Sequence, residues 1–142
     1  MKRGDESILF NEEFKIYSQN RVSFTAITAE VAAVVKKSGI KEGFAVIFIP
    51  HTTAGVTLNE NADPDVVTDM KAIIENLVPR EGLYRHREGN TSAHMMTSLM
   101  GSSQQIIIRG GKLLLGTWQG IFLIDFDGPR ERKVLVQIQG EK

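Results

Sequence analysis

The 142-residue sequence contains no cysteine, and this absence excludes several kinds of site. The chain can have no disulfide bond, no thiolate nucleophile and no zinc finger built on cysteine. A metal ion would have to be held by imidazole and carboxylate groups, and the chain has only three histidines. Those three histidines are therefore the only candidate set for a histidine-based metal site.

Net charge and long apolar runs are also missing. The 17 Lys and Arg residues balance the 17 Asp and Glu residues, so no overall field attracts nucleic acid or an anionic membrane. No segment approaches the roughly 18–20 apolar residues that a membrane-spanning helix needs. No apolar signal core follows the first residues. We therefore expect a cytoplasmic protein that binds neither nucleic acid nor membrane.

The pattern along the chain predicts a single α+β domain. No repeat, low-complexity tract or flexible linker marks a boundary, so we expect one domain over residues 1–142, with residues 1–11 as an N-terminal arm. Strands are predicted at 14–17, 22–26, 44–49, 56–58, 105–108, 113–115, 120–126 and 134–138. The run 44–49 is apolar at every position, which is typical of a buried strand. Strands at both ends and helices in the middle indicate a mixed, mostly antiparallel sheet with two to three helices.

Three segments carry the signals of helices. The first is expected to begin with Thr28 as its N-cap and to stop at Gly39. The second begins at Pro64, which suits the first helical position, after Asp63 as the cap. A short third helix is expected over residues 93–100. The connection before it is long for a compact domain, and such loops are usually functional or disordered.

None of the three histidines lies on a predicted core strand. His51 follows a buried strand, and strand ends are common places for sites. A surface histidine that caps a strand end is the structural alternative for this residue. His86 and His94 lie in and just after the long loop, and could converge with His51 in space. Three neutral imidazoles with an open position are typical of a catalytic metal site, although the spacing matches no fixed ligand motif.

Acidic residues gather where the second helix is expected to begin. Asp63 and Asp65 can complement the positive end of the helix dipole. That explanation does not cover Glu60 and Asp69. A bound cation, an arginine partner or a role in acid–base chemistry would account for these two.

The C-terminal third contains a glycine-rich turn and two arginines. The only tryptophan, Trp118, lies in the turn and either lines a pocket or packs the turn itself. Arg130 and Arg132 are two residues apart, so on one strand face they could bind a phosphate or carboxylate together. The alternative is a hairpin turn whose arginines pair with nearby acids. The sequence carries no glycine-rich nucleotide-binding motif and no nucleophile elbow.

These blocks together resemble the signature of the YjbQ-like family. The resemblance is carried by His-Thr-Thr-Ala-Gly-Val-Thr-Leu-Asn-Glu-Asn at 51–61, Gly-Thr-Trp-Gln-Gly-Ile at 116–121 and Asp-Gly-Pro-Arg at 127–130. It extends over residues 12–140, nearly the whole chain. It implies an α+β fold, a homotrimer and the activity of a secondary thiamine-phosphate synthase. That enzyme joins a hydroxymethylpyrimidine diphosphate to a thiazole phosphate and releases pyrophosphate.

Taken with the residue patterns, the resemblance also implies roles for individual residues. The expected catalytic residues are His51, Glu60, Asp69, Trp118 and Gln119. The residues expected to bind a small phosphorylated substrate are Thr52, Thr53, Asn59, Asp63, Arg130 and Arg132. The expected ligands of a divalent metal, zinc or magnesium, are His51, His86 and His94.

No organic cofactor is indicated. Two other functions remain open from the sequence. One is a metal-dependent hydrolase of a phosphorylated or amide small molecule, and the other is a non-catalytic protein that binds a metal or a ligand.

Overall fold

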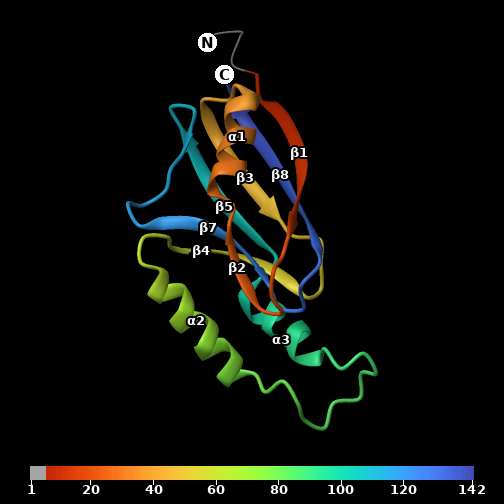
Figure 1. Ribbon diagram of the computed structural model, residues 1–142. Helices are drawn as coiled ribbons and strands as arrows, with labels where there is room; N and C mark the ends of the chain where they lie inside the picture. Colours follow the sequence, from red (N-terminus) through yellow and green to blue (C-terminus); the bar gives the residue numbers. More distant parts are fainter. Residues whose placement is uncertain (1–5) are drawn as a thin grey trace.

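The computed structural model describes residues 6–142, which form three helices and eight strands in two sheets (Figure 1). The strands are β1 (Ile8–Tyr17), β2 (Ser23–Ala26), β3 (Glu42–Phe48), β4 (Ala54–Glu60), β5 (Ser103–Arg109), β6 (Lys112–Leu113), β7 (Gln119–Asp125) and β8 (Glu131–Glu141). The helices are α1 (Thr28–Ser38), α2 (Pro64–Leu77) and α3 (Thr91–Met100). The predicted single α+β domain is confirmed, with two sheets in place of the one expected. None of the helices in residues 6–142 has the length and apolar character needed to cross a membrane.

Strand β7, in the smaller of the two sheets, lies between two apolar cores. The larger sheet has the order β1-β8-β3-β5-β6, the smaller has β2-β7-β4, and neighbouring strands run antiparallel. In Figure 1, α1 lies across the larger sheet, and α2 and α3 lie below the smaller one. Ile121 and Leu123 belong to the main core, whereas Phe122 and Ile124 face the second core beside α2 and α3. Burial on both faces explains why β7 is apolar along most of its length.

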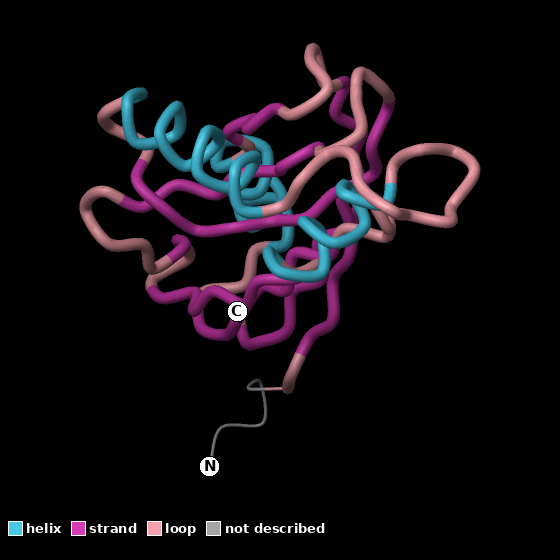
Figure 2. The backbone as a smooth tube through the Cα atoms, turned by 90° about the horizontal axis from the view of Figure 1, so that it is seen from below, coloured by secondary structure: helices cyan, strands magenta, loops and turns pink. Residues whose placement is uncertain are grey.

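The predicted residues at the ends of the helices are confirmed for α1 at Gly39 and for α2 at Asp63, but not at Thr28. Asp63 caps α2, because its side chain accepts a hydrogen bond from the Asp65 amide at 2.9 Å. Gly39 ends α1 in the left-handed conformation, with φ of 71°. The prediction that Thr28 is an N-cap is wrong: its hydroxyl accepts from the Ile121 amide at 2.9 Å instead and so joins α1 to β7. Figure 2 shows in pink the loops that join these elements.

The expected N-terminal arm over residues 1–11 is shorter than predicted. Residues 8–11 already belong to β1, where Ile8 is paired with Gly140 and Asn11 with Gln137. Side chains alternate along this strand, so that Ile8 and Phe10 pack on the main core. The first five residues of the predicted arm lie outside the described residues.

The apolar run at 44–49 is buried on one face only. Ala45 and Ile47 are fully buried in the main core. On the opposite face, Phe44 and Val46 are half-buried and Phe48 is 43% exposed. A strand that is apolar at every position is typical of burial on both faces. A single chain therefore leaves the outer face of β3 without the cover that its sequence predicts.

Candidate functional site

A buried ion pair lies at one end of the β4–β7 ladder, where Ala54 is paired with Asp125. Arg132 of β8 donates from Nε and Nη2 to the two oxygens of Asp125, at 2.9 and 2.7 Å. The side chains of Arg132 and Asp125 are 3% and 1% exposed. Nη2 of Arg132 also donates to Thr53, at 2.7 Å to Oγ1 and 3.2 Å to the carbonyl oxygen. One guanidinium therefore ties β7, β8 and the segment before β4 together.

Asp125 receives two further hydrogen bonds. The Ser18 hydroxyl donates to Oδ2 at 2.6 Å, and the Asp127 amide donates to Oδ1 at 2.8 Å. Burial alone would raise the pKa of the Asp125 carboxyl, but the bonds from Arg132, Ser18 and Asp127 outweigh it and lower the pKa. The carboxylate is therefore ionised and fully partnered, which is the arrangement that a buried charge requires.

His51 lies beside this network, just beyond the end of β3. Its Nε2 accepts a hydrogen bond from the Lys133 backbone amide at 2.8 Å, where β8 extends past its last pair with β3. Because an amide can only donate, Nε2 carries no proton and the neutral ring holds its hydrogen on Nδ1. Partial burial, followed by the charge of Arg132, lowers the pKa of His51. At pH 7 the ring is thus neutral, and it offers a hydrogen-bond donor at Nδ1.

A second set of polar contacts runs from this end of the ladder to α3. Asp127 Oδ2 accepts from Asn90 Nδ2 at 2.7 Å and from Arg130 Nη2 at 3.1 Å. The Arg130 side chain is 52% exposed, so its guanidinium also reaches solvent. On α3, the ring of His94 lies edge-to-face with the ring of His86, with 5.4 Å between their centroids. Two of the three predicted metal ligands therefore meet.

The predicted three-histidine centre is not formed within one chain. Across residues 6–142, no group of three or more His, Asp or Glu side chains is placed to hold a metal ion. The Nε2 lone pair of His51 is occupied by the Lys133 amide, whereas His86 and His94 lie in and after the loop that precedes α3. A three-ligand site on His86 and His94 needs a further ligand from outside residues 6–142.

The two arginines do not form one fork for a ligand. β8 begins at Glu131, so Arg130 precedes the strand and pairs with Asp127, while Arg132 is buried against Asp125. The prediction that they share one strand face is therefore wrong, and the alternative that they pair with nearby acids is confirmed. Of the two, Arg130 is the one that exposes its guanidinium.

The remaining predicted residues lie at the other end of the same ladder. Glu60 is paired in register with Gln119, and the Asn61 amide donates to the Trp118 carbonyl at 2.8 Å. The Trp118 side chain is 64% exposed. Six residue steps separate Glu60 from Ala54, which is about 20 Å of extended strand. One chain therefore divides the predicted catalytic residues into two distant groups.

Several side chains in this second group also have local structural contacts. Asn59 Oδ1 accepts from the Glu60 amide at 2.7 Å, and Glu60 Oε2 accepts from the Asp63 amide at 3.3 Å. Gln119 Oε1 accepts from the Gly116 amide at 2.8 Å and closes the turn before β7. Asp69 is exposed on α2, as Thr52 is beside His51.

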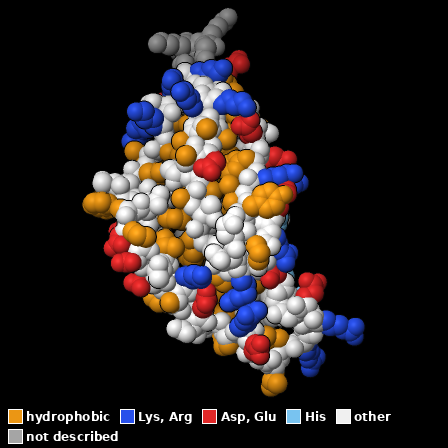
Figure 3. Space-filling model, in the orientation of Figure 1, with side chains coloured by type: hydrophobic (Ala, Val, Ile, Leu, Met, Phe, Trp, Pro, Cys, Tyr) orange, Lys and Arg blue, Asp and Glu red, His pale blue; other side chains and the backbone are white. Residues whose placement is uncertain are grey.

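The carboxylates at this end are not neutralised by cations. Within residues 6–142, no ion pair is formed by Glu60, Asp63, Asp65 or Asp69. Figure 3 shows acidic side chains gathered at the left edge of the molecule, where α2 begins in Figure 1. An arginine partner was one of the explanations considered for Glu60 and Asp69. Residues 6–142 contain no such partner for either carboxylate.

Comparison with known proteins identifies the family. Residues 12–141 match the model of the family described as UPF0047 protein YjbQ-like. The chain belongs to the YjbQ family. A YjbQ-family relative from Methanocaldococcus jannaschii, UPF0047 protein MJ1081, is 48% identical over 130 residues, covering 92% of this chain and 94% of that protein. UPF0047 protein YugU of Bacillus subtilis is 49% identical over 127 residues, covering 89% of this chain and 96% of that protein.

Solved structures of the YjbQ family share the fold. The crystal structure of a family member from Clostridium acetobutylicum has a TM-score of 0.88 and 54% identity, covering 89% of this chain and 98% of that chain. A structure from Sulfolobus solfataricus has a TM-score of 0.92 and 32% identity, covering 96% of this chain and 100% of that chain. The names of these four proteins state no reaction and no ligand.

Sequence reasoning assigned no role to Ser18, which this member of the YjbQ family uses to hold Asp125. No local signal could have found it, because the two residues are 107 positions apart. Asn90, which joins α3 to Asp127 across 37 positions, was missed for the same reason. Both residues lie in segments without periodic pattern, and their partners became visible only in the folded chain.

Proposed function

We propose that this chain is an enzyme that acts on a phosphorylated small molecule at the end of the ladder that holds His51 and Arg130. The observation that carries the proposal is the neutral His51 ring, held by the Lys133 amide so that Nδ1 donates, close to the half-exposed guanidinium of Arg130. Arg130 is near enough for its charge to lower the pKa of His51, and its guanidinium is half exposed. A donor and a cation together stabilise negative charge on a phosphate or a departing pyrophosphate.

Within this class we favour the reaction that the family resemblance implies. The thiazole ring nitrogen attacks the methylene carbon of the pyrimidine diphosphate, the carbon–oxygen bond breaks, and pyrophosphate leaves with the electron pair. In this reaction His51 and Arg130 would stabilise the leaving group through Nδ1 and the guanidinium. A homotrimer and a cytoplasmic location belong to the same proposal, and sedimentation and cell fractionation test them.

A divalent metal is the second source of positive charge in the proposal. His86 and His94 would hold zinc, because their rings already meet and imidazole suits that ion. The carboxylates of Glu60, which is half-buried, and of Asp69, which is exposed, would suit magnesium, which prefers oxygen ligands. When bound, either ion would neutralise charge on a phosphate.

The same histidine pair favours a second function, a metal-dependent hydrolase. Two imidazoles on one metal leave positions for water, and a metal-bound water can attack a phosphoester or an amide. Hydrolysis would depend on His86 and His94, whereas coupling by the first mechanism would depend on His51 and Arg130. The two functions can therefore be separated by variants of the chain.

The test is an assay of the purified chain with both thiamine precursors, with chelator, zinc or magnesium added in turn. Thiamine phosphate and pyrophosphate are measured together. We expect turnover, and we expect His51→Ala and Arg130→Gln each to lower kcat by about 10²- to 10³-fold, the usual effect of removing one group that stabilises developing charge. Arg109→Gln, an exposed arginine at the end of β5, is the matched control and should leave kcat unchanged.

The pH dependence sharpens this test. Because the pKa of His51 is lowered, the neutral donor form is present above the ordinary histidine value of about 6.5, and activity falls as pH drops through the folded pKa. Coupling that is absent under every metal condition, or that is unaffected in both variants, contradicts the first function. Hydrolysis of a phosphatase or amidase substrate without coupling supports the second. Absence of both activities favours the non-catalytic binding protein.

A further inference from the structure

An apolar hollow lies between the end of α2, the loop that follows it and the start of α3, in the lower part of the molecule in Figure 1. Its volume is about 480 Å³, within the usual range of ligand pockets. A dry apolar cavity of about 150 Å³ already binds benzene, so this hollow has room for a larger apolar group. Among residues 6–142, neither His51 nor Arg130 lines it, so the hollow is separate from the site proposed above.

The walls of the hollow are apolar and open to solvent. Leu77 of α2 is 66% exposed, and Met95 and Leu99 of α3 are 49% and 52% exposed. Contiguous exposed apolar side chains of this kind mark a place where an apolar group binds. On the α2 side, the Pro79 carbonyl is already occupied, because it accepts from the Tyr84 hydroxyl at 2.7 Å. The polar groups that are free for a ligand must therefore be sought on the α3 side.

Two hydroxyls without partners lie at the α3 end of the hollow, on Thr91 and Ser92. Thr91 Oγ1 is buried and has no hydrogen-bond partner in residues 6–142. Ser92 is 3% exposed, and its hydroxyl makes no hydrogen bond among the same residues. A buried hydroxyl without a partner costs free energy, which a ligand oxygen would recover. These two side chains therefore indicate a ligand with a polar end.

The same two residues form the first turn of α3, where the backbone amides have no partner inside the helix. No side chain caps this end, since Asn90, the residue before it, donates its side-chain amide to Asp127 at 2.7 Å instead. The free amides and the dipole of a helix N-terminus favour an anion. The polar end of the ligand is thus expected to carry negative charge.

The loop at 78–90 adds positive charge beside the hollow. It contains three arginines, at 80, 85 and 87, and two glutamates, at 81 and 88. Within residues 6–142, the three arginines form no ion pair. Arg80 follows Pro79 and Arg85 follows Tyr84, and both of these neighbours line the hollow. The charge of the rim therefore agrees with the preference of the helix end for an anion.

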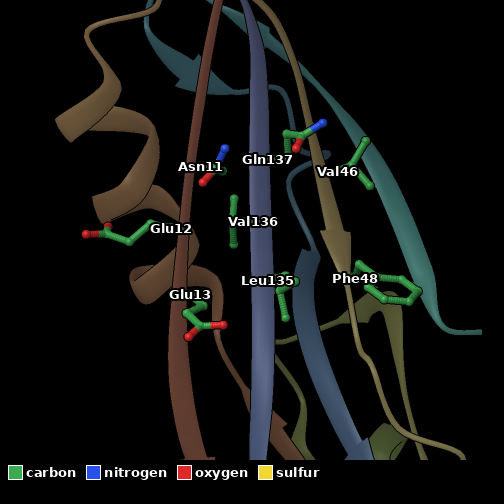
Figure 4. Close-up of a pocket in the computed structure, with 8 residues that line it drawn as sticks. All are labelled: Asn11, Glu12, Glu13, Val46, Phe48, Leu135, Val136 and Gln137. Atoms are coloured by element: carbon green, nitrogen blue, oxygen red, sulfur yellow. The ribbon is translucent and has the colours of Figure 1, made fainter.

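The hollow on the outer face of the larger sheet has a different character. Its volume is about 680 Å³, and Glu13 and Gln137 line it beside Leu135 and Phe48 (Figure 4). A carboxylate in the lining repels an anionic ligand. Of these two hollows, the one at α3 is therefore the one that combines apolar walls with an end that attracts negative charge.

We propose that the hollow at α3 binds a small apolar carboxylic acid in its ionised form. The apolar part lies against Leu77, Met95 and Leu99, and the carboxylate accepts hydrogen bonds from the hydroxyls and amides of the first turn of α3. This ligand goes beyond the reaction proposed above. Because Tyr84 lines the hollow and His86 follows two residues later, a bound acid also steadies the loop that carries one of the paired histidines.

The test titrates octanoate, phenylbutyrate and octanol into the full chain at pH 7 and follows the methyl NMR signals of its methionines. Met95 lines the hollow, so its signal should shift and saturate, whereas Met70, which lies on α2 outside the lining, should not respond. Octanol has no charge and should bind about tenfold more weakly than octanoate, or weaker still. Comparison of octanoate with phenylbutyrate distinguishes an aliphatic from an aromatic acid.

Variants separate the two parts of the proposed site. Thr91→Val combined with Ser92→Ala removes both hydroxyls and should weaken octanoate binding about tenfold, while octanol binding stays unchanged. Leu99→Trp fills the hollow and should abolish binding of all three probes. Leu114→Trp, at an exposed leucine in the loop before β7, is the matched control and should bind the probes as the wild type does.

Three results would overturn the inference: no saturable Met95 shift at millimolar octanoate, octanol binding as tight as octanoate binding, or binding that Leu99→Trp leaves unchanged. A hollow that a second copy covers in solution would give the first of these results. None of the measurements requires turnover, so the carboxylate site and the proposed reaction can fail independently of each other.

Discussion

At the Ala54 end of the β4–β7 ladder an ion pair, Arg132 with Asp125, is buried, whereas at the Glu60 end the carboxylates form no ion pair among residues 6–142. Asp125 and Arg132 use their hydrogen-bonding groups on each other and on nearby chain segments. Glu60 and Asp69 carry negative charges that no cation within residues 6–142 neutralises. A buried charge must be matched by its own fold, while an exposed charge costs little and stays available to a ligand or partner. The buried pair thus holds the structure at the first end, whereas the carboxylates of the second end are open to outside contacts.

The largest expected change in stability among these tests is that of Arg132→Leu. The substitution leaves the Asp125 carboxylate buried without its main partner, and we expect a loss of about 3–5 kcal/mol in the free energy of unfolding, measured by urea denaturation at pH 7. Arg109→Leu, which removes an exposed arginine, should change stability by no more than about 0.5 kcal/mol. A loss at Arg132 as small as that control would show that the buried pair is not what holds this end together.

A smaller effect is expected at the open end from Asp63→Ala. The side chain accepts the Asp65 amide hydrogen bond, and loss of an N-cap typically costs about 1 kcal/mol. Asp63→Asn keeps the acceptor and should retain most of that stability. Thermal denaturation of the two variants compares them directly. Equal losses in both would mean that charge, and not capping, is the contribution of this residue.

The smallest effect, and one of opposite sign, is expected from Asp69→Asn. Asp65 and Asp69 are four residues apart on α2, and removing one of two like charges should stabilise the chain by about 0.2–0.5 kcal/mol. Asp69→Glu keeps the repulsion and should leave the urea midpoint unchanged. A clear loss of stability in Asp69→Asn would reveal a partner for this carboxylate and remove the contrast between the two ends.

Features that depend on sequence neighbours could be predicted, and features that depend on distant ones could not. The Asp63 cap and the Gly39 stop are settled within one turn of helix, and both are confirmed. Thr28 was misread as a cap because its hydroxyl bonds to Ile121, 93 positions later. The same limit applies to Arg132. The sequence allowed it to pair with a nearby acid but did not indicate that this acid is Asp125.

The division of the candidate site has a simple physical origin. The stretch 51–61 looks like one motif in the sequence, but β4 runs through it. An extended strand advances about 3.3 Å per residue, against about 1.5 Å in a helix, so His51 and Glu60 are carried to opposite ends of the ladder. Spacing alone does not convey this distance.

The α2 helix has no buried residue, and this affects how it moves. Its contacts with the second core come from side chains such as Val67 and Ile74, which are only partly covered. Detaching the helix exposes little additional apolar surface, so its local opening requires less free energy than unfolding either sheet. The acidic groups at its start therefore belong to a segment that can change position while the strands stay intact. A cation or partner that binds these acids shifts the population of helix positions, and the sheets need not rearrange.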